Sequence, residues 1–279
     1  MTIAAAPTVR LLHGADMPQL GLGTSPMGNA QTERAVATAI EAGYRLIDTA
    51  EAYGNELGVG RGIRASGIAR EELFITTKFD RHWHGRDLAA QGYQAGLDRL
   101  GLDYADLLLI HWPNPQLDRY VQAFQGLADL LDAGRLKAIG TSNFKPAHLD
   151  RIITETGVVP DVNQIQLSPA VTRDQSRAYH HKHGIVTESW SPLGGQGAAV
   201  LNQPVIIDIA KEIGRTPAQV ILRWNIELGL VTIPKSSNPQ RIHENINIFD
   251  FTLTPQQTAA ITALDHGEST AVDSDKFGH

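Results

Sequence analysis

Hydrophobic residues are grouped in eight short runs that are rich in branched aliphatic side chains and recur along the whole chain. Turn residues bound each run, and a segment with helical spacing follows it. The runs lie mostly about 25 to 33 residues apart, which is the length of one strand followed by one helix. The pattern therefore predicts eight strands that alternate with helices. The predicted strands are Gln19–Leu22, Tyr44–Ile47, Leu73–Thr77, Asp106–Ile110, Leu136–Ile139, Val162–Ile165, Ile185–Glu188 and Leu230–Ile233.

Two segments between the predicted strands carry the signature of a helix start. Thr216 and Thr254 are each followed by Pro and, three residues after the threonine, by Gln. This order supplies an N-cap, a first-turn proline and the second member of a capping box. The segment 33–42 shows apolar residues at helical spacing instead. We expect a helix in each of these three places.

Eight alternating strand and helix units without a linker favour one parallel (β/α)8 TIM barrel, formed by the single domain 1–279, over two domains. The segment 7–18 is expected to form an N-terminal β-hairpin that turns at Gly14. The segment from Pro192 to Gln203 is expected to be an extended loop at the C-terminal face of the barrel. Other connections of that face are expected to be loops as well.

An open, doubly wound sheet is the alternative fold. It would bind a dinucleotide through a Gly-x-Gly-x-x-Gly motif between a strand and a helix, and no predicted strand is followed by that motif. Gly58, Gly60 and Gly62 have a different spacing. We interpret these glycines as positions of close helix packing.

The composition limits the classes of function. The formal charge is 24 − 30 = −6, with 42% hydrophobic and 19% charged residues, which is typical of a soluble globular protein. There is no cysteine, so disulfides, thiolate nucleophiles and Cys-ligated metals are excluded. A mildly acidic chain without a basic stretch is a poor nucleic-acid binder, and no apolar run approaches the ~18 residues that suggest a membrane span. The N-terminal segment lacks the pattern of a signal peptide, so we expect a cytoplasmic protein.

Polar residues follow almost every predicted strand. In an α/β barrel the C-terminal ends of the strands meet at one mouth, where the chemistry is carried out. Seven of the eight predicted strands end in a charged or hydrogen-bonding side chain, and these groups are expected to converge. The residues are Gly23, Thr24, Asp48, Lys78, His111, Ser142, Asn143, Gln166, Ser189, Trp190, Ser191, Lys235 and Ser236.

Asp48, Tyr53, Lys78 and His111 together suit the protonation of a carbonyl oxygen. A tyrosine with a pKa near 10 is a poor acid at neutral pH, and a neighbouring ammonium lowers that pKa. Lys78 can supply the ammonium, and Asp48 can keep it protonated and oriented. His111 can donate a hydrogen bond to the carbonyl oxygen. These roles predict an enzyme that adds a proton as hydride arrives at the carbonyl carbon.

Five sequence motifs resemble those of the aldo-keto reductase family, and the resemblance covers nearly the whole chain. Bacterial members similar to diketogluconate reductases resemble it most, given the compact length and short tail. The motifs are Gly43-Tyr44-Arg45-Leu46-Ile47-Asp48-Thr49-Ala50 with Tyr53-Gly54-Asn55-Glu56, Thr77-Lys78, Ile110-His111-Trp112-Pro113, Ile139-Gly140-Thr141-Ser142-Asn143-Phe144, and the segment from Ile233 to Asn245.

The resemblance implies that Tyr53 is the general acid, that Lys78 and Asp48 tune it, and that His111 orients the carbonyl. It also implies NADPH bound in extended form. The cofactor-binding residues carried over are Gly23, Thr24, Ser142, Asn143, Gln164 in place of Gln166, Trp190, Ser191, Leu193, Gln196, Lys235, Ser236, Arg241, Glu244 and Asn245. Met27, Trp83 and Trp112 are expected to line the substrate pocket.

The resulting prediction is a monomeric enzyme that reduces aldehydes or ketones, such as dicarbonyls or keto-sugars, with NADPH. Two alternatives stay open: the same barrel as an alcohol or sugar dehydrogenase, and a non-catalytic subunit that senses the cofactor. A metal-dependent isomerase is disfavoured, because only Asp48 and His111 at the strand ends suit a metal. His180, His181 and His183 are interpreted as helix residues and not as ligands, so no metal is expected.

Overall fold

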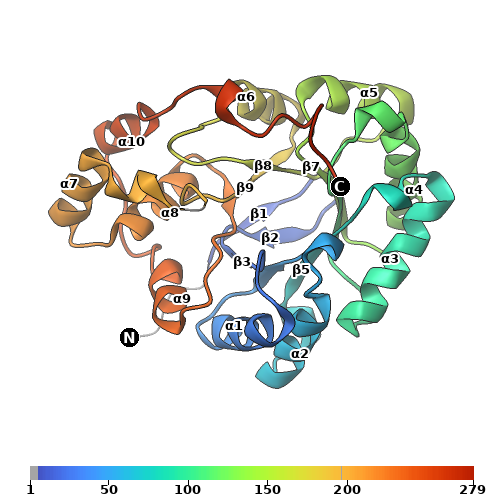
Figure 1. The fold of residues 1–279 in the computed structure, drawn as a ribbon, viewed down its shortest axis with the longest axis horizontal. Helices are drawn as coiled ribbons and strands as arrows, with labels where there is room; N and C mark the ends of the chain where they lie inside the picture. Colours follow the sequence, from blue (N-terminus) through green and yellow to red (C-terminus); the bar gives the residue numbers. More distant parts are fainter. Residues whose placement is uncertain (1–5, 196) are drawn as a thin grey trace.

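The computed structural model describes residues 6–195 and 197–279. Eight parallel strands form one sheet in the order β10-β9-β8-β7-β6-β5-β4-β3. Its two edges meet through bridges between Leu20 and Thr232 and between Gly23 and Lys235, so the sheet closes into a barrel (Figure 1). The predicted (β/α)8 TIM barrel is thereby confirmed. The strands are β3 Gly21–Gly23, β4 Leu46–Asp48, β5 Phe74–Phe79, β6 Leu107–Ile110, β7 Ala138–Ser142, β8 Val162–Gln166, β9 Val186–Trp190 and β10 Val231–Thr232.

Helices surround the barrel and bury the outward faces of the strands. Leu108 and Ile110 point outward into the core beneath α3, α4 and α5, whereas Leu107 and Leu109 point into the barrel. This alternation is what a strand covered on both faces requires. The helices are α1 Asn29–Glu41, α2 Glu56–Ser66, α3 Arg86–Leu100, α4 Tyr120–Asp132, α5 Pro146–Thr156, α6 Asp174–His183, α7 Pro204–Ile213, α8 Pro217–Glu227, α9 Pro239–Ile246 and α10 Pro255–Thr262.

A β-hairpin closes the N-terminal end of the barrel, as the sequence predicts. Its strands β1, Thr8–Arg10, and β2, Asp16–Pro18, pair antiparallel around a turn in which Gly14 has a φ of +96°. Met17 on β2 is fully buried and packs among the inward-facing residues of the barrel strands. Figure 1 shows the hairpin across the middle of the ring. Any opening to the barrel interior must therefore lie at the other end.

The two predicted capping boxes are present. The Thr216 hydroxyl accepts a hydrogen bond from the Gln219 backbone N–H, and the Gln219 side chain accepts one from the Thr216 N–H in return. The same pair of bonds joins Thr254 and Gln257 at the start of α10. The predicted loop from Pro192 to Gln203 contains one 3-10 turn, Ala199–Asn202.

Three strands end later than the hydrophobic pattern predicts. β5 continues to Phe79, β7 to Ser142 and β9 to Trp190, each two or three residues past the predicted end. The reason is that the polar residues Lys78, Ser142 and Ser189 near these ends still pair in the sheet. Polar side chains there stop the hydrophobic run without stopping the strand.

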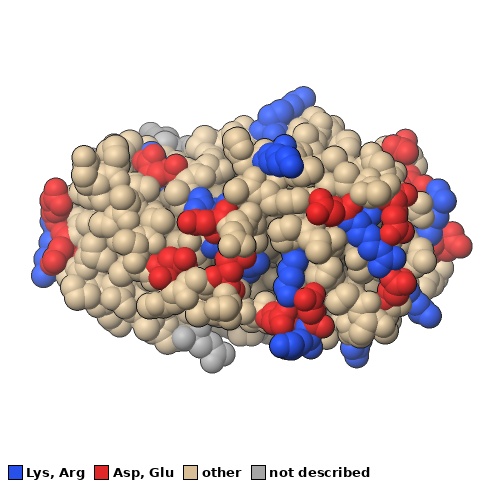
Figure 2. Space-filling view, turned by 90° about the horizontal axis from the view of Figure 1, so that it is seen from above, with Lys and Arg blue, Asp and Glu red and all other residues tan. Residues whose placement is uncertain are grey.

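One face of the molecule carries charges of both signs. Lys and Arg are interspersed with Asp and Glu over the face drawn in Figure 2, the arrangement of an ordinary solvated surface. Among the described residues, none of the helices combines the length and the apolar character needed to cross a bilayer.

Three glycines on α2 permit close helix packing, as their spacing suggested. A Cβ atom on Gly60 would lie 1.7 Å from the carbonyl oxygen of Leu100, at the end of α3. On Gly58 and Gly62 it would lie 2.4 Å and 2.7 Å from backbone oxygens of α1. Backbone atoms cannot yield as side chains do, so α2 fits between α1 and α3 only with glycine at these positions.

Gly60→Ala is expected to destabilise the protein by about 3 kcal/mol, the upper end for overpacking, because the new methyl group meets backbone. Gly96→Ala on α3 is the matched control: a Cβ there would have only ordinary contacts, 3.5 Å and beyond. Urea unfolding measures both. Equal stability of the two variants would contradict the packing role of Gly60.

Candidate active site

The predicted catalytic residues come from three neighbouring strands at the open end of the barrel. Asp48 is the last residue of β4, Lys78 lies near the end of β5 and His111 directly follows β6. Tyr53 ends the 3-10 turn Glu51–Tyr53 that follows β4. Asp48, Tyr53 and His111 line a cavity of about 660 Å³ at this mouth. The structure thus brings all four residues of the predicted group together.

The Lys78 ammonium is the centre of this group. Its Nζ donates to Asp48 Oδ1 at 2.7 Å and Oδ2 at 2.9 Å, to the Thr49 carbonyl at 2.9 Å, and to the Tyr53 hydroxyl at 3.3 Å. The Lys78 side chain is fully buried and that of Asp48 nearly so. A buried ion pair is tolerated when further hydrogen bonds satisfy both ions, as happens here.

Burial and charge act against each other in this group. Burial alone would lower the pKa of Lys78, but Asp48 and Tyr53 raise it above its usual value, so the lysine stays cationic. Burial raises the pKa of Tyr53, and the Lys78 charge lowers it only in part. Lys78 thus lowers the pKa of Tyr53, as expected from the sequence. Burial has the larger effect, however, so the pKa of Tyr53 is raised overall. Tyr53 consequently holds its proton at neutral pH.

His111 presents one ring nitrogen to the cavity. Its Nδ1 lies 3.2 Å from Asp80 Oδ1 and 3.2 Å from His279 Nε2, which leaves Nε2 available to a molecule in the cavity that His111 lines. Burial lowers the pKa of His111 to about 4. The imidazole is therefore neutral at pH 7. Its edge meets the Tyr53 ring, with centroids 5.5 Å apart.

Gln164 on β8 joins this group to a second carboxyl. Gln164 Nε2 donates to Asp48 Oδ2 and to Glu188 Oε2, each at 2.8 Å. Both amide protons are thereby used inside the protein. Gln164 also lines the cavity, so Oε1, an acceptor, is the part of this amide that remains for a ligand.

The other residues expected to hold the nicotinamide end lie along β7 and β9. Asn143 Nδ2 donates to the His111 carbonyl and to Ser142 Oγ, and Asn143 Oδ1 accepts from Trp190 Nε1 at 2.9 Å. These bonds fix the Trp190 ring in the cavity wall. Gly23 and Thr24 line the opposite wall, and Thr24 Oγ1 donates to the Asp48 carbonyl.

The residues expected around the pyrophosphate and the adenosine of the cofactor fall into two groups. One group lines the cavity, and the other lies just after Lys235 in the sequence. Ser191, Leu193 and Lys235 line the cavity. Ser236 is buried next to Lys235, and Arg241, Glu244 and Asn245 lie on α9, which starts three residues later at Pro239. Gln196 lies outside the described residues. Among the described residues, no carboxylate approaches Lys235 or Arg241 within 4.0 Å, so both exposed cations are available to a ligand.

Known proteins of one family resemble this chain over nearly its whole length. A family model described as "Aldo/keto reductase family" matches residues 17–266. An aldo-keto reductase of Mycolicibacterium smegmatis is 48% identical over 272 residues, which is 98% of each chain. Methylglyoxal reductase DkgA of Escherichia coli (strain K12) is 47% identical over 275 residues, 98% of this chain and 99% of its own.

Two solved structures are also similar. An aldo/keto reductase from Brucella melitensis has a TM-score of 0.89 and 47% identity, and the match covers 94% of this chain and 100% of that one. A variant of Gox0644 in complex with NADPH has a TM-score of 0.91 and 40% identity, with 98% of each chain covered. The chain belongs to the aldo/keto reductase family. The resemblance drawn from the motifs and the expected enzyme class, an NADP-dependent oxidoreductase, are confirmed.

Of the three residues expected in the substrate pocket of this aldo/keto reductase, the structure puts only Trp112 in the cavity wall. Met27 is 1% exposed and packs in the core, and its carbonyl accepts a hydrogen bond from Asn55 Nδ2. Ser25 and Pro26 line the cavity in its place. Trp83 Nε1 donates a hydrogen bond to the Glu51 carboxylate, and the Trp83 ring packs on α3 at Gly92.

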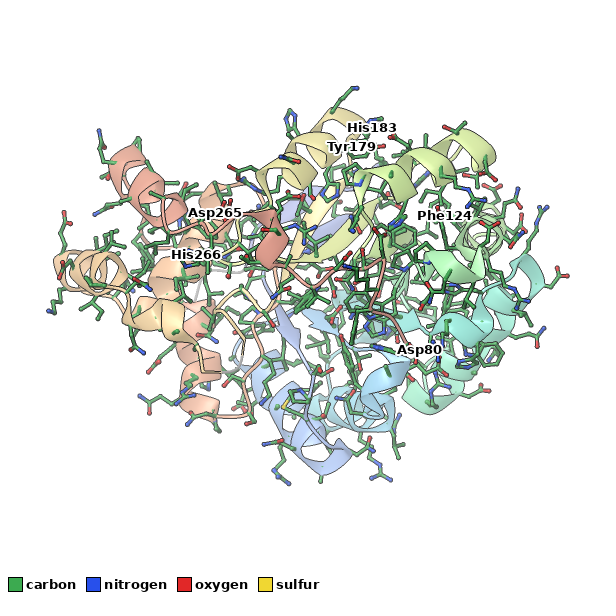
Figure 3. All side chains as sticks on the ribbon, turned by 45° about the horizontal axis from the view of Figure 1, so that its top comes forward. Asp80, Phe124, Tyr179, His183, Asp265 and His266 are labelled. Atoms are coloured by element: carbon green, nitrogen blue, oxygen red, sulfur yellow. The ribbon has the colours of Figure 1, made fainter. Side chains whose placement is uncertain are left out.

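The histidines of α6 have structural contacts. His180 is buried, with Nε2 2.9 Å from Asn163 Nδ2 and Nδ1 2.8 Å from Thr187 Oγ1. The His183 ring stacks on Tyr179 at 4.4 Å on the outer surface of the helix (Figure 3). These two rings therefore have different partners, one in the protein interior and one on the helix surface.

The sequence did not single out Glu188 or His279. Glu188 is fully buried, and its Oε1 has no hydrogen-bond partner. Its place could have been inferred, since it lies two residues before Trp190 on β9 and therefore on the same inward face. Burial, together with the nearby Asp48 charge, raises the pKa of Glu188 to about 8. His279, at the other end of the sequence, lines the cavity, and no local pattern indicates that contact.

As pH rises, the free energy of unfolding of Glu188→Gln is expected to increase relative to that of the wild type. Between the usual pKa of a glutamate and about 8, the unfolded wild type loses its proton while folded Glu188 keeps it. The folded state then binds more protons, so wild-type stability falls with pH by up to about 1.4 kcal/mol per unit. Urea unfolding at pH 5, 6, 7 and 8 measures the difference.

The exposed Glu72→Gln variant is the control, because it removes the same charge without burial. Its stability should stay parallel to that of the wild type. A pH-independent difference between Glu188→Gln and the wild type would show that Glu188 binds no extra proton in the folded state.

Proposed function

We propose that this enzyme reduces a small aldehyde or ketone to an alcohol, with Tyr53 as the proton donor and NADPH as the cofactor. The observation that carries the proposal is the hydrogen bond from the buried Lys78 ammonium to the Tyr53 hydroxyl, next to Asp48 and at a cavity wall. Tyr53 is the acid, and the Lys78 ammonium stabilises the phenolate that remains when the proton leaves. The Asp48 carboxylate keeps the ammonium in place.

The cavity fits a nicotinamide dinucleotide phosphate. It extends from Tyr53 and His111 to Lys235, as an extended ligand requires. Gln164 Oε1 faces the inner end as an acceptor for an amide N–H₂, and the Trp190 ring offers a flat surface beside it. Ser142 and Asn143 lie next to both. When bound, the cofactor supplies a hydride to the carbonyl carbon.

The protein's own residues then handle the proton. Tyr53 donates its hydroxyl proton to the carbonyl oxygen, and the phenolate left behind accepts a hydrogen bond from Lys78 Nζ. His111 Nε2–H donates to the same oxygen and holds it near Tyr53. Asp48 remains ionised against Lys78 and keeps the ammonium oriented. Solvent returns the proton to Tyr53 afterwards.

The far end of the site suits a phosphate on the adenosine ribose. Lys235 and Arg241 are cations without a carboxylate neighbour among the described residues, and Ser236 offers a hydroxyl between them. Asn238 caps α9 there, so Arg241 stands in the first turn of that helix. Glu244 and Asn245 on the next turn are placed to meet the adenine. We assign the preference for NADPH over NADH to Lys235, Ser236 and Arg241.

We propose a small substrate because two curated relatives, 46% and 47% identical to this chain, are named methylglyoxal reductase. Trp112 and His279 bring bulky rings to the cavity wall. Dicarbonyls and keto-sugars are the classes to test, by following NADPH absorbance against a panel of them. Three further points stay predictions: that residues 1–279 form a single domain, that the enzyme is a monomer, and that it is cytoplasmic. The dehydrogenase direction and a non-catalytic sensor are not favoured.

Tyr53→Phe is expected to lower kcat about 10²-fold or more, since it removes a positioned acid and nothing else. NADPH affinity, measured by isothermal titration, should stay close to that of the wild type. Tyr104→Phe is the matched control: Tyr104 lies before the N-terminal end of β6, with Arg70 over its ring, and should keep full activity. Turnover of Tyr53→Phe within a few-fold of wild type would remove Tyr53 from the mechanism.

Arg241→Ala is expected to weaken NADPH binding by about 1.5–3 kcal/mol, the scale of a hydrogen bond to a charged group, and NADH binding hardly at all. The loss should shrink as salt is added, because the contact is electrostatic. Titration of both cofactors into wild type, Arg241→Ala and the exposed Arg61→Ala on α2 separates the local effect from a general loss of charge. Equal losses for NADPH and NADH would contradict the proposed role of Arg241.

A further inference from the structure

Three ligand atoms from distant parts of the chain converge at the edge of the cavity. His111 Nδ1 lies 3.2 Å from Asp80 Oδ1 and 3.2 Å from His279 Nε2. The third side of the triangle, from His279 Nε2 to Asp80 Oδ1, measures 3.7 Å. Each of the three residues offers one atom that can bind a metal ion. Two imidazoles and one carboxylate thus face one point.

The triangle has the size of a tetrahedral zinc site. Zn–N and Zn–O bonds of about 2.0–2.1 Å at tetrahedral angles separate neighbouring ligand atoms by about 3.3 Å. Two sides of the triangle are 0.1 Å shorter than this spacing and one is 0.4 Å longer. A set of two His and one carboxylate also leaves a fourth position for water or a ligand.

Hydrogen bonds alone leave this cluster incompletely satisfied. A ring nitrogen carries either a proton or a lone pair, so His111 Nδ1 cannot donate to Asp80 and also accept from His279. The two 3.2 Å contacts of His111 Nδ1 therefore cannot both be ordinary two-centre hydrogen bonds. Each of the three ligand atoms offers an electron pair when it is not protonated. A divalent cation at the same point accepts all three electron pairs at once.

The segment that carries His279 is attached beside the barrel mouth. Lys145 Nζ contacts Asp273 and Asp275, each at 2.6 Å, and Gln166 Oε1 accepts from the Val272 N–H. The Phe277 ring packs on Trp112 with centroids 4.8 Å apart. In Figure 1 the dark-red C-terminal segment returns from the region of α6 to the ring of strands and ends near the β7 label. These contacts hold the third ligand in place before any metal binds.

We propose that Asp80, His111 and His279 form a binding site for Zn²⁺ or a similar divalent transition-metal ion that inhibits the enzyme. The ion would tether His279 to His111 in the cavity wall and so restrict the space and motion that substrate exchange needs. The metal site itself does not rest on the proposed function, because binding is measurable without substrate or cofactor, whereas the inhibitory role rests on it. It differs from the expectation of no metal, which considered the histidines of α6 and the strand-end residues Asp48 and His111 but not Asp80 or His279.

The experiment uses the full chain without an affinity tag, freed of metal with EDTA and dialysed into a non-coordinating buffer. Isothermal titration with Zn²⁺ is expected to show one saturable site per chain. Co²⁺ in its place should give the intense visible absorption of a four-coordinate ion. Reductase activity should fall along the same saturation curve as Zn²⁺ is added, and EDTA should restore it.

His279→Ala and Asp80→Asn each weaken or remove one ligand and are expected to reduce Zn²⁺ affinity about tenfold or more. Each variant's metal-free activity serves as its own reference. His266→Ala is the matched control, since His266 lies on the opposite side of the molecule from Asp80 in Figure 3, and its affinity should equal that of the wild type. His82→Ala tests the neighbouring imidazole, which lies 3.4 Å from Glu51.

Zn²⁺ binding that survives both His279→Ala and Asp80→Asn would overturn the proposal, as would binding that is lost only in His82→Ala. Absence of a saturable site in the wild type would overturn it as well. Binding that follows the predicted pattern without any fall in activity would refute the inhibitory role. None of these outcomes bears on Tyr53, whose variant is tested in the absence of metal.

Discussion

The Lys78 ammonium and the Asp48 carboxylate lie in contact at a depth where neither reaches solvent, and a charge left alone there would be neutralised or expelled. Contact requires β4 and β5 to pair in one register, with Asp48 opposite Thr76. Lys78 then stands two residues further along β5, on the same inward face. A shift of one residue would turn one of the two charges toward the helices. The ion pair and the sheet register therefore depend on each other, and the position of Tyr53 depends on both.

The second consequence of this burial concerns Glu188. One ammonium faces two carboxyls in the barrel, so a fully ionised set would leave a net negative charge without solvent. Because burial and Asp48 raise the pKa of Glu188 to about 8, the carboxyl stays protonated at neutral pH and the interior is neutral. Gln164 donates to both carboxyls and so cannot rotate its amide without losing two hydrogen bonds. A residue on β9 that touches no ligand thus determines which atom of Gln164 a ligand meets.

Local pattern was sufficient to predict the barrel, its hairpin and the approximate position of each strand. It also indicated Asp48, Lys78 and His111, because parallel strands bring their C-terminal ends together whatever the rest of the chain does. Met27 could not be placed in this way, since the Asn55 side chain that binds its carbonyl comes from the next strand–helix unit. Asp80, His111 and His279 are near one another only because the segment after α10 returns to the mouth. Sequence reasoning finds what the regular fold imposes and misses contacts that one irregular segment makes.

The contacts at the strand ends and those of the segment after α10 also differ in strength. Strand-end residues are held by the sheet and by buried hydrogen bonds. The segment after α10 is attached largely through exposed ion pairs of Lys145 and aromatic edges on Trp112, and an exposed ion pair contributes at most about 1 kcal/mol. Substitutions in that segment can therefore reshape the outer cavity at little cost in stability and without displacing Lys78 or Asp48. If Tyr53 acts as proposed, the proton donor is kept by the sheet, while the outer cavity wall that this segment forms is altered independently.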